Sequence, residues 1–154
     1  MTLGRFLDPK NDLAFKRIFG TERNQDILIH FLNDIFDLQE APIQKVTFLK
    51  TVRVPEIAAQ RSSLVDVLCE DQRGDRFIIE MQVDAEPGFE QRAQYYAAKA
   101  YVEQRVKILE EGDKKKIDYG DLKKIRFLAI TSHVLFPEKK AYLSHHKMTD
   151  IETK

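Results

Sequence analysis

The stretch 62–83 constrains the fold most, because two strand-like segments flank the turn sequence Asp71-Gln72-Arg73-Gly74-Asp75. A three-residue loop with Gly74 in the left-handed conformation pairs the two flanking aspartates, and pairing then continues outward. This register places Asp66 directly opposite Glu80. The sequence therefore predicts an antiparallel hairpin whose pairing is fixed by its turn.

The two faces of this hairpin differ in character. One face is uniformly apolar and is expected to be the core side, and it carries Val65, Val67, Cys69, Phe77, Ile79, Met81 and Val83. The other face mixes acids with aliphatics, and it carries Leu64, Asp66, Leu68, Ile78, Glu80 and Gln82. Two carboxylates are thus expected in one patch, while the lone cysteine is expected to be a small buried hydrophobe.

The remaining elements follow from apolar periodicity and from start and stop residues. Helical spacing predicts a short helix that follows the capping residues Asn11 and Asp12 and stops at Gly20. It also predicts a second helix at about 22–37 and a long one at about 89–111. Residues 46–52 and 125–131 are rich in β-branched and aromatic residues and predict two more strands. The fold class is α/β, with a mixed central sheet flanked by helices in the order ααβββαβ.

Length and composition limit the class of protein. The 154 residues suit a single domain, and the ending without a clear closing element suggests the N-terminal part of a longer protein. No apolar run can span a bilayer and no signal peptide is visible, so we expect a cytoplasmic protein without a membrane partner. With 25 basic and 25 acidic residues, the chain lacks the global charge of a tight DNA binder. A local patch at 114–116 and 123–124 could contact nucleic acid or be a solvated loop.

Facing carboxylates repel each other unless a cation or a proton lies between them. Asp66 and Glu80 therefore indicate a site for Mg²⁺ or Mn²⁺, which prefer hard oxygen ligands and can activate water for attack on a phosphodiester. The alternative is that both acids only lie on the solvent-facing side of the hairpin and pair with basic side chains from a neighbouring helix.

Several segments of the chain resemble a known family. Two lie in the hairpin, Val65-Asp66-Val67-Leu68 and Ile79-Glu80-Met81-Gln82-Val83, and two follow it, 89–92 and Tyr95-Tyr96. Another precedes the hairpin, Pro9-Lys10-Asn11-Asp12-Leu13-Ala14-Phe15-Lys16-Arg17-Ile18-Phe19-Gly20. This is the group of PD-(D/E)XK nuclease family transposases, which includes the Rpn recombination-promoting nucleases. The resemblance covers nearly the whole chain. It implies a restriction-endonuclease-like core and metal-dependent cleavage of DNA.

The resemblance also implies roles for individual residues. Asp66 matches the metal-binding aspartate, Glu80 the second acid, and Gln82 the position where the wider superfamily has lysine. An amide can orient water but cannot supply the positive charge of a lysine. The resemblance thus implies cleavage chemistry without the charge that lysine supplies in the wider superfamily.

Four further residues are candidates for the site. Asp12 is either an upstream metal ligand or an acid favoured by the helix N-terminus. Arg92 and Lys99 lie two helical turns apart and either face the substrate phosphate together or form solvent-facing salt bridges. Tyr96 either binds substrate or packs in the core.

Two functions remain open on the sequence alone. The first is a Mg²⁺-dependent DNA endonuclease associated with transposition or recombination, in which Asp66 and Glu80 bind metal and Gln82 orients the nucleophile. The alternative is a catalytically weak or inactive nuclease-fold domain that serves as a nucleic-acid-binding or protein-interaction module. DNA is the expected partner, and the chain is a possible homo-oligomer.

Overall fold

The computed structural model describes residues 8–49, 65–110 and 118–153. Its helices are α1 (Asp12–Phe19), α2 (Gln25–Ile35) and α3 (Phe89–Glu110), with single 3-10 turns at η1 (Glu22–Asn24) and η2 (Tyr119–Asp121). Its strands are β1 (Val46–Phe48), β2 (Val67–Asp71), β3 (Arg76–Gln82) and β4 (Ile125–Thr131). The predicted element order is confirmed, and the second helix begins with a 3-10 turn where a longer α-helix was expected.

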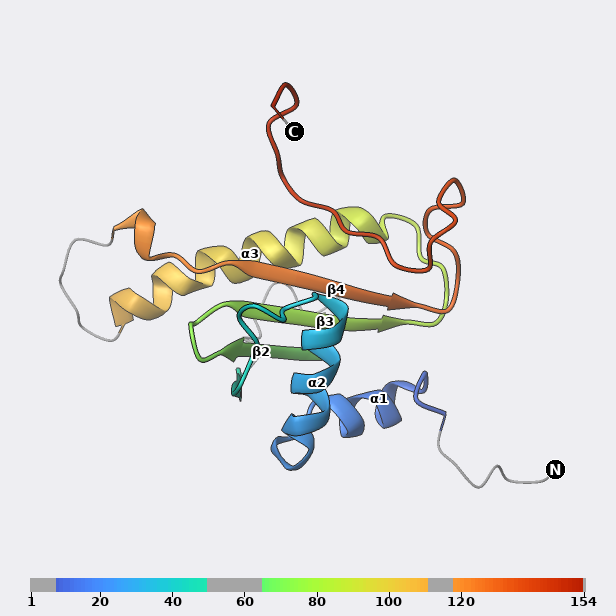
Figure 1. Ribbon diagram of the computed structural model, residues 1–154, viewed down its shortest axis with the longest axis horizontal. Coiled ribbons are helices and arrows are strands. Elements are labelled where there is room, and N and C mark those ends of the chain that lie inside the picture. The colour runs from blue at the N-terminus through green and yellow to red at the C-terminus, as the bar shows by residue number, and fades with distance from the viewer. Residues whose placement is uncertain (1–7, 50–64, 111–117, 154) are drawn as a thin grey trace, which may run out of the picture.

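The strands form one mixed sheet in the order β1-β2-β3-β4 (Figure 1). The first three strands are antiparallel neighbours, whereas β4 is parallel to β3 and is reached through the α3 crossover. A parallel pair needs such a long connection, because the chain must return to the same end of the sheet. The fold is therefore α/β with a restriction-endonuclease-like arrangement of a mixed sheet between helices.

The hairpin has the predicted turn and register. Gly74 adopts φ +85°, and the Asp71 amide donates to the Asp75 carbonyl at 2.9 Å. The buried Asp71 carboxylate fixes the loop further, because its Oδ1 accepts from the Arg73 and Asp75 amides and its Oδ2 from the Arg73 guanidinium. The ladder runs to the pair Val67↔Ile79, which makes residues 66 and 80 the next positions outward.

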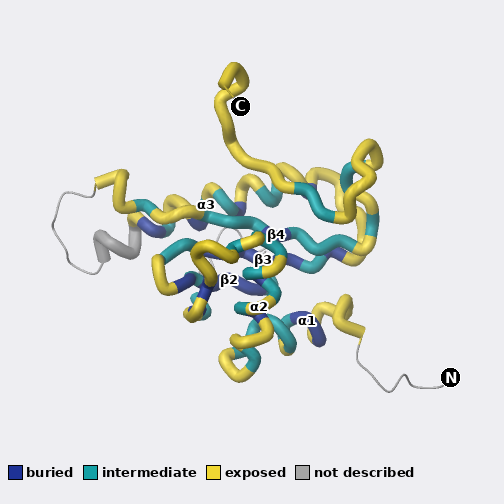
Figure 2. Tube along the Cα trace, viewed as in Figure 1, coloured by how far each residue is buried: buried dark blue, intermediate teal, exposed yellow. Residues whose placement is uncertain are grey.

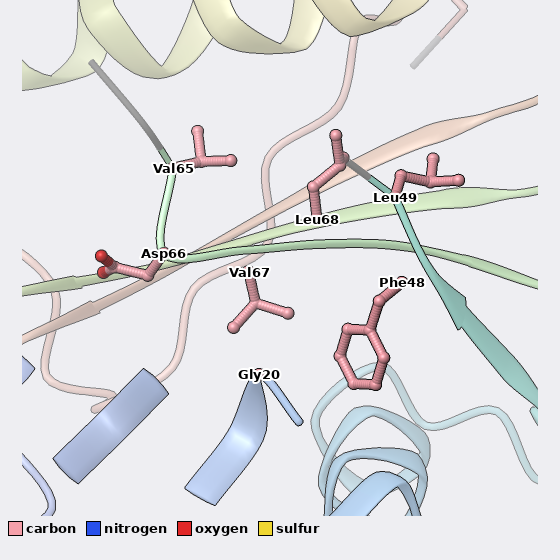
Figure 3. A pocket seen from close by; sticks show the side chains of 7 residues that line it. All are labelled: Gly20, Phe48, Leu49, Val65, Asp66, Val67 and Leu68. Atoms are coloured by element: carbon pink, nitrogen blue, oxygen red, sulfur yellow. The ribbon is translucent and has the colours of Figure 1, made fainter. Parts of the chain in front are cut away.

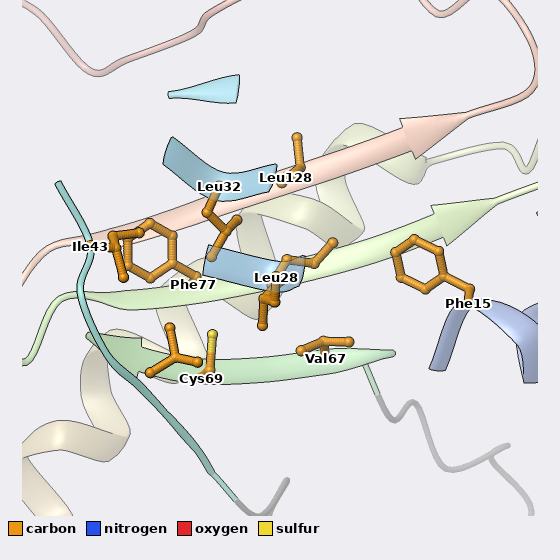
Figure 4. Packing of buried hydrophobic residues seen from close by; sticks show 10 residues of the cluster. Phe15, Leu28, Leu32, Ile43, Val67, Cys69, Phe77 and Leu128 are labelled. Atoms are coloured by element: carbon orange, nitrogen blue, oxygen red, sulfur yellow. The ribbon is translucent and has the colours of Figure 1, made fainter. Parts of the chain in front are cut away.

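Each face of the sheet has its own apolar cluster. The larger cluster joins α1 and α2 to the sheet, and Figure 4 shows the packing of Phe15, Leu28, Leu32, Ile43, Val67, Cys69, Phe77 and Leu128. The smaller cluster lies under α3 and joins Leu68, Ile78, Tyr96 and Ala100. The sheet is therefore the middle of three layers, and Figure 2 shows its central strands as the most buried part of the chain.

Two residues predicted for the apolar core side lie elsewhere. Val65 packs against the α3 cluster, because a bend at Asp66 precedes β2 and breaks the strict alternation of side chains. Val83 is 48% exposed, because β3 ends at Gln82 and the chain leaves the sheet. By contrast, Cys69 is fully buried as expected, and this burial raises the pKa of its thiol to about 12.

Three further predictions concern the start of α1, the extent of β1 and the membrane. The short α1 begins after Asn11, whose side-chain oxygen accepts from the Leu13 and Ala14 amides, as an N-cap does. The predicted strand at 46–52 is seen as β1, and its residues 50–52 lie outside the described part of the chain. Within the described ranges, no helix combines the length and the apolar character that crossing a membrane requires.

Candidate functional site

Asp66 lies in the bend that leads into β2, and its carboxylate is fixed by the neighbouring strand. Its Oδ2 accepts a hydrogen bond of 2.8 Å from the Met81 amide of β3. β2 begins only at Val67, so the side chain takes the place of the missing backbone acceptor. The Asp66 side chain is only 9% exposed. Its burial and the bond to Met81 together hold the carboxylate in one position at the open end of the hairpin.

Figure 3 shows this carboxylate directed away from the apolar side chains around it. Those side chains, with Gly20, line a small hollow between β1 and the start of β2, and they are Phe48, Leu49, Val65, Val67 and Leu68. Asp66 is the one charged lining residue of this hollow among the described residues. The acid therefore borders the hollow but makes its polar contacts outside it.

Glu80 lies in the middle layer, on the central strand β3, and is 8% exposed. Burial raises the pKa of its carboxyl group, Arg92 opposes that increase, and the carboxylates of Asp66 and Glu86 add to it. Its Oε2 is buried and has no hydrogen-bond partner among the described residues. A carboxylate that is buried, close to another acid and with one oxygen lacking a hydrogen-bond partner is one that a bound cation would stabilise.

Gln82 and Arg92 form a second part of the site. The Gln82 amide donates through Nε2 to the Asp84 carbonyl at 2.9 Å and accepts through Oε1 from Nη2 of Arg92 at 2.6 Å. The same guanidinium lies 3.6 Å from Oε1 of Glu80 and also contacts Glu86. Arg92 therefore brings positive charge from the first turns of α3 to the position beside Gln82.

The docking of α3 on the sheet explains why Arg92 reaches this point. Arg76 of β3 donates to the Ala100 carbonyl at 3.0 Å, a buried contact. Further along, the Gln104 amide exchanges two hydrogen bonds with the backbone of Lys123, just before β4. These polar contacts fix the helix along its length and so fix its N-terminal end over the end of β3.

Lys16 of α1 is a site residue that the sequence reasoning did not single out. Its ammonium lies 3.1 Å from Oδ1 of Asp66 and 3.0 Å from Oδ1 of Asp12. The i,i+4 spacing with Asp12 was a signal for that pair. The contact with Asp66 joins residues 50 positions apart, and only the packing of α1 beside the hairpin reveals it.

The other predicted candidates lie in different environments. Asp12 is 71% exposed in its side chain and reaches Asp66 only through Lys16. Tyr96 is 8% exposed and packs with Leu68 and Ile78, which favours the core role. Lys99 is half-buried and lies about 10 Å beyond Arg92 along the helix axis, with no ion pair to a described carboxylate.

The acidic pair fits a divalent cation in the nature of its donors. Asp66 and Glu80 supply hard oxygen atoms, and Oε2 of Glu80 is free of other partners among the described residues. No group of three or more His, Cys, Asp or Glu side chains in the described ranges is placed to hold a metal.

Comparison with known proteins gives one match. A family model described as PD-(D/E)XK nuclease family transposase matches residues 9–154. Searches of the curated proteins and of the solved structures found no match. The matched range includes every residue of the site described above.

Proposed function

The chain belongs to the PD-(D/E)XK nuclease family transposases, and on that premise we propose that it is a cytoplasmic, Mg²⁺- or Mn²⁺-dependent DNA endonuclease acting in transposition or recombination. Family membership supports a nuclease role associated with transposition. The proposed metal dependence rests on the buried Glu80 carboxylate, which lies near a second acid, Asp66. Its Oε2 has no hydrogen-bond partner among the described residues.

The proposed reaction is hydrolysis of a phosphodiester. Water adds to phosphorus, one ester P–O bond breaks, and the strand ends in a phosphate and a hydroxyl group. A bound divalent cation supplies Lewis-acid activation of the water and of the phosphodiester. Asp66 and Glu80 are the residues proposed to hold it, and their rigid attachment to β3 keeps the two carboxylates in place.

Arg92 is proposed to supply the positive charge that the wider superfamily takes from lysine. A guanidinium is well suited to phosphate oxygens, because it offers several donors in one plane. Its side chain is 29% exposed, so substrate can reach it. Gln82 is proposed to hold this guanidinium in position through Oε1.

A second candidate function has one specific observation in its favour. Both polar atoms of the Gln82 amide already have partners within the protein, Asp84 and Arg92, and these partners fix its orientation before any water binds. A nuclease-fold domain that binds nucleic acid or protein without efficient cleavage would tolerate this arrangement. The two functions differ in whether DNA strands are cut.

A plasmid-nicking assay tests the proposal, run with Mg²⁺, Mn²⁺ or EDTA. Asp66→Asn keeps an oxygen for the Met81 amide and Glu80→Gln keeps the side-chain shape, so both variants should fold. We expect nicking that needs metal and falls by about 10²–10³ in each variant, as for loss of a charge-stabilising group.

Glu40→Ala is the matched control for the loss of one acid. Its neighbour Ala41 accepts from Arg73 in the hairpin loop, at the opposite end of β2 from Asp66. The control should nick like the wild type. Absence of metal-dependent nicking in the wild type would favour the binding module, and equal nicking by wild type, Asp66→Asn and Glu80→Gln would exclude this site.

A further inference from the structure

Lys16 connects the acidic pair to α1 through two short contacts. Its ammonium bridges Oδ1 of Asp66, at 3.1 Å, and Oδ1 of Asp12, at 3.0 Å. The Lys16 side chain is 40% exposed and that of Asp12 is 71% exposed, whereas that of Asp66 is 9% exposed. The ammonium therefore lies at the boundary between the buried acid and solvent.

The two oxygens of Asp66 differ in how firmly they are held. Oδ2 accepts a hydrogen bond from the Met81 backbone amide, and this bond can break only if the rigid β3 strand shifts. Oδ1 is held by a long, half-exposed lysine that has a second carboxylate within reach. Of the two oxygens, Oδ1 is therefore the one that a divalent cation could more readily gain, and Lys16 now occupies it.

We propose that Lys16 is the internal counterion of Asp66 and competes with the divalent cation for Oδ1. Asp12 is the alternative partner that holds the ammonium when it leaves Asp66. Asp12 accordingly acts on the metal site through Lys16 and is not a ligand. This inference rests on the proposed function, because it concerns the same metal site.

Titration with Mn²⁺ alone, followed by calorimetry on the purified full chain, measures this competition. Lys16→Gln removes a positive charge beside the site, and at such distances the Coulomb term corresponds to about threefold to tenfold tighter binding of a divalent cation. Lys16→Arg keeps the charge and should stay within about twofold of the wild type.

Lys45→Gln is the matched control for the loss of one lysine. Lys45 is exposed and precedes Val46, which pairs with Asp71 at the far end of β2 from Asp66. The Lys45→Gln variant should bind Mn²⁺ with the same affinity as the wild type. Circular dichroism should show the same fold for all variants.

A double-mutant cycle separates the two roles of Asp12. Asp12→Asn alone should weaken Mn²⁺ binding by about threefold, because Lys16 then has only Asp66 as a partner. In the Lys16→Gln background the same change should have no effect. A weakening of equal size in both backgrounds would make Asp12 a ligand and overturn its role as a partner of Lys16.

The remaining outcomes are also decisive. Unchanged or weaker Mn²⁺ binding by Lys16→Gln would overturn the competition. No Mn²⁺ binding by either wild type or Lys16→Gln would overturn this inference together with the metal site. Mn²⁺ binding that follows the predicted order without any DNA cleavage would support this inference and contradict the proposed function alone.

Discussion

Nη2 of Arg92 lies 2.6 Å from Oε1 of Gln82, so the residue at the position of the superfamily lysine is a hydrogen-bond partner of a cation from α3. The other end of the amide donates to the Asp84 carbonyl, which fixes its orientation. The guanidinium of Arg92, on the helix, therefore lies beside the amide on the strand. The strand residue is left as the group that positions it.

This relationship predicts that restoring the lysine on the strand is harmful. Gln82→Lys would place an ammonium against the Arg92 guanidinium and remove its acceptor, and we expect a loss of about 1–3 kcal/mol in stability from the unpaired, partly buried groups. Nicking activity should also fall. Urea unfolding and the plasmid assay measure the two effects.

The double variant Gln82→Lys with Arg92→Gln is the control for this prediction. It exchanges the two residue types and again leaves one cation beside one amide, so part of the stability and activity should return. Higher activity of Gln82→Lys alone than of wild type would show that Arg92 does not replace the lysine charge.

The raised pKa of Glu80 predicts a pH dependence of stability. Burial is the main cause of the raised pKa. At pH values above the ordinary pKa of 4.5, Glu80 therefore holds a proton more readily in the folded protein than in the unfolded chain. The contribution of this group to stability is therefore fully present below pH 4.5 and is lost as pH rises through the raised pKa. Glu80→Gln cannot lose a proton.

The stability of Glu80→Gln relative to wild type should thus increase between pH 4.5 and neutral pH, in metal-free buffer. Urea unfolding at several pH values measures this difference. Glu40→Gln, an exposed acid far from the site, serves as the control. A difference between Glu80→Gln and wild type that stays constant with pH would contradict the assigned cause.

The hairpin turn predicts a cost for any side chain at position 74. Gly74 has φ +85°, and an added Cβ would lie 3.2 Å from Cγ of Lys123. We expect Gly74→Ala to reduce the free energy of unfolding by about 1–2 kcal/mol. Gly120→Ala is the matched control, since that residue has no positive φ and its nearest contact is 3.4 Å. Equal losses in the two variants would contradict the turn assignment.

Metal binding to the folded state predicts a rise in thermal stability. At a hundred times the dissociation constant, a ligand that binds only the folded protein adds about 2.7 kcal/mol. Differential scanning calorimetry with and without Mn²⁺ should show a higher Tm for wild type and little change for Asp66→Asn. An equal rise in both proteins would place the bound metal elsewhere.

The sequence predicted the fold well where local signals agree. The turn at Gly74 and the alternation along β3 fix the register that brings residues 66 and 80 to neighbouring positions. Alternation failed at Val65 and Val83, since a bend and a strand end are set by contacts that periodicity does not encode.

The site was less predictable than the fold. Arg92 was among the candidates, but its hydrogen bond to Gln82 depends on how α3 docks over β3. Lys16 was absent from them, because its contact with Asp66 joins two elements that are distant in sequence. The acids Asp66 and Glu80 follow from the hairpin pattern. The basic side chains of Lys16 and Arg92 are brought beside them by tertiary packing.

Anomalous diffraction from crystals soaked in Mn²⁺ tests the central claim most directly. The account predicts one peak bounded by the carboxylates of Asp66 and Glu80, with Oε2 of Glu80 as a ligand, and no peak there in Asp66→Asn. A Mn²⁺ peak bound elsewhere, or none between these two side chains at saturating Mn²⁺, would contradict it.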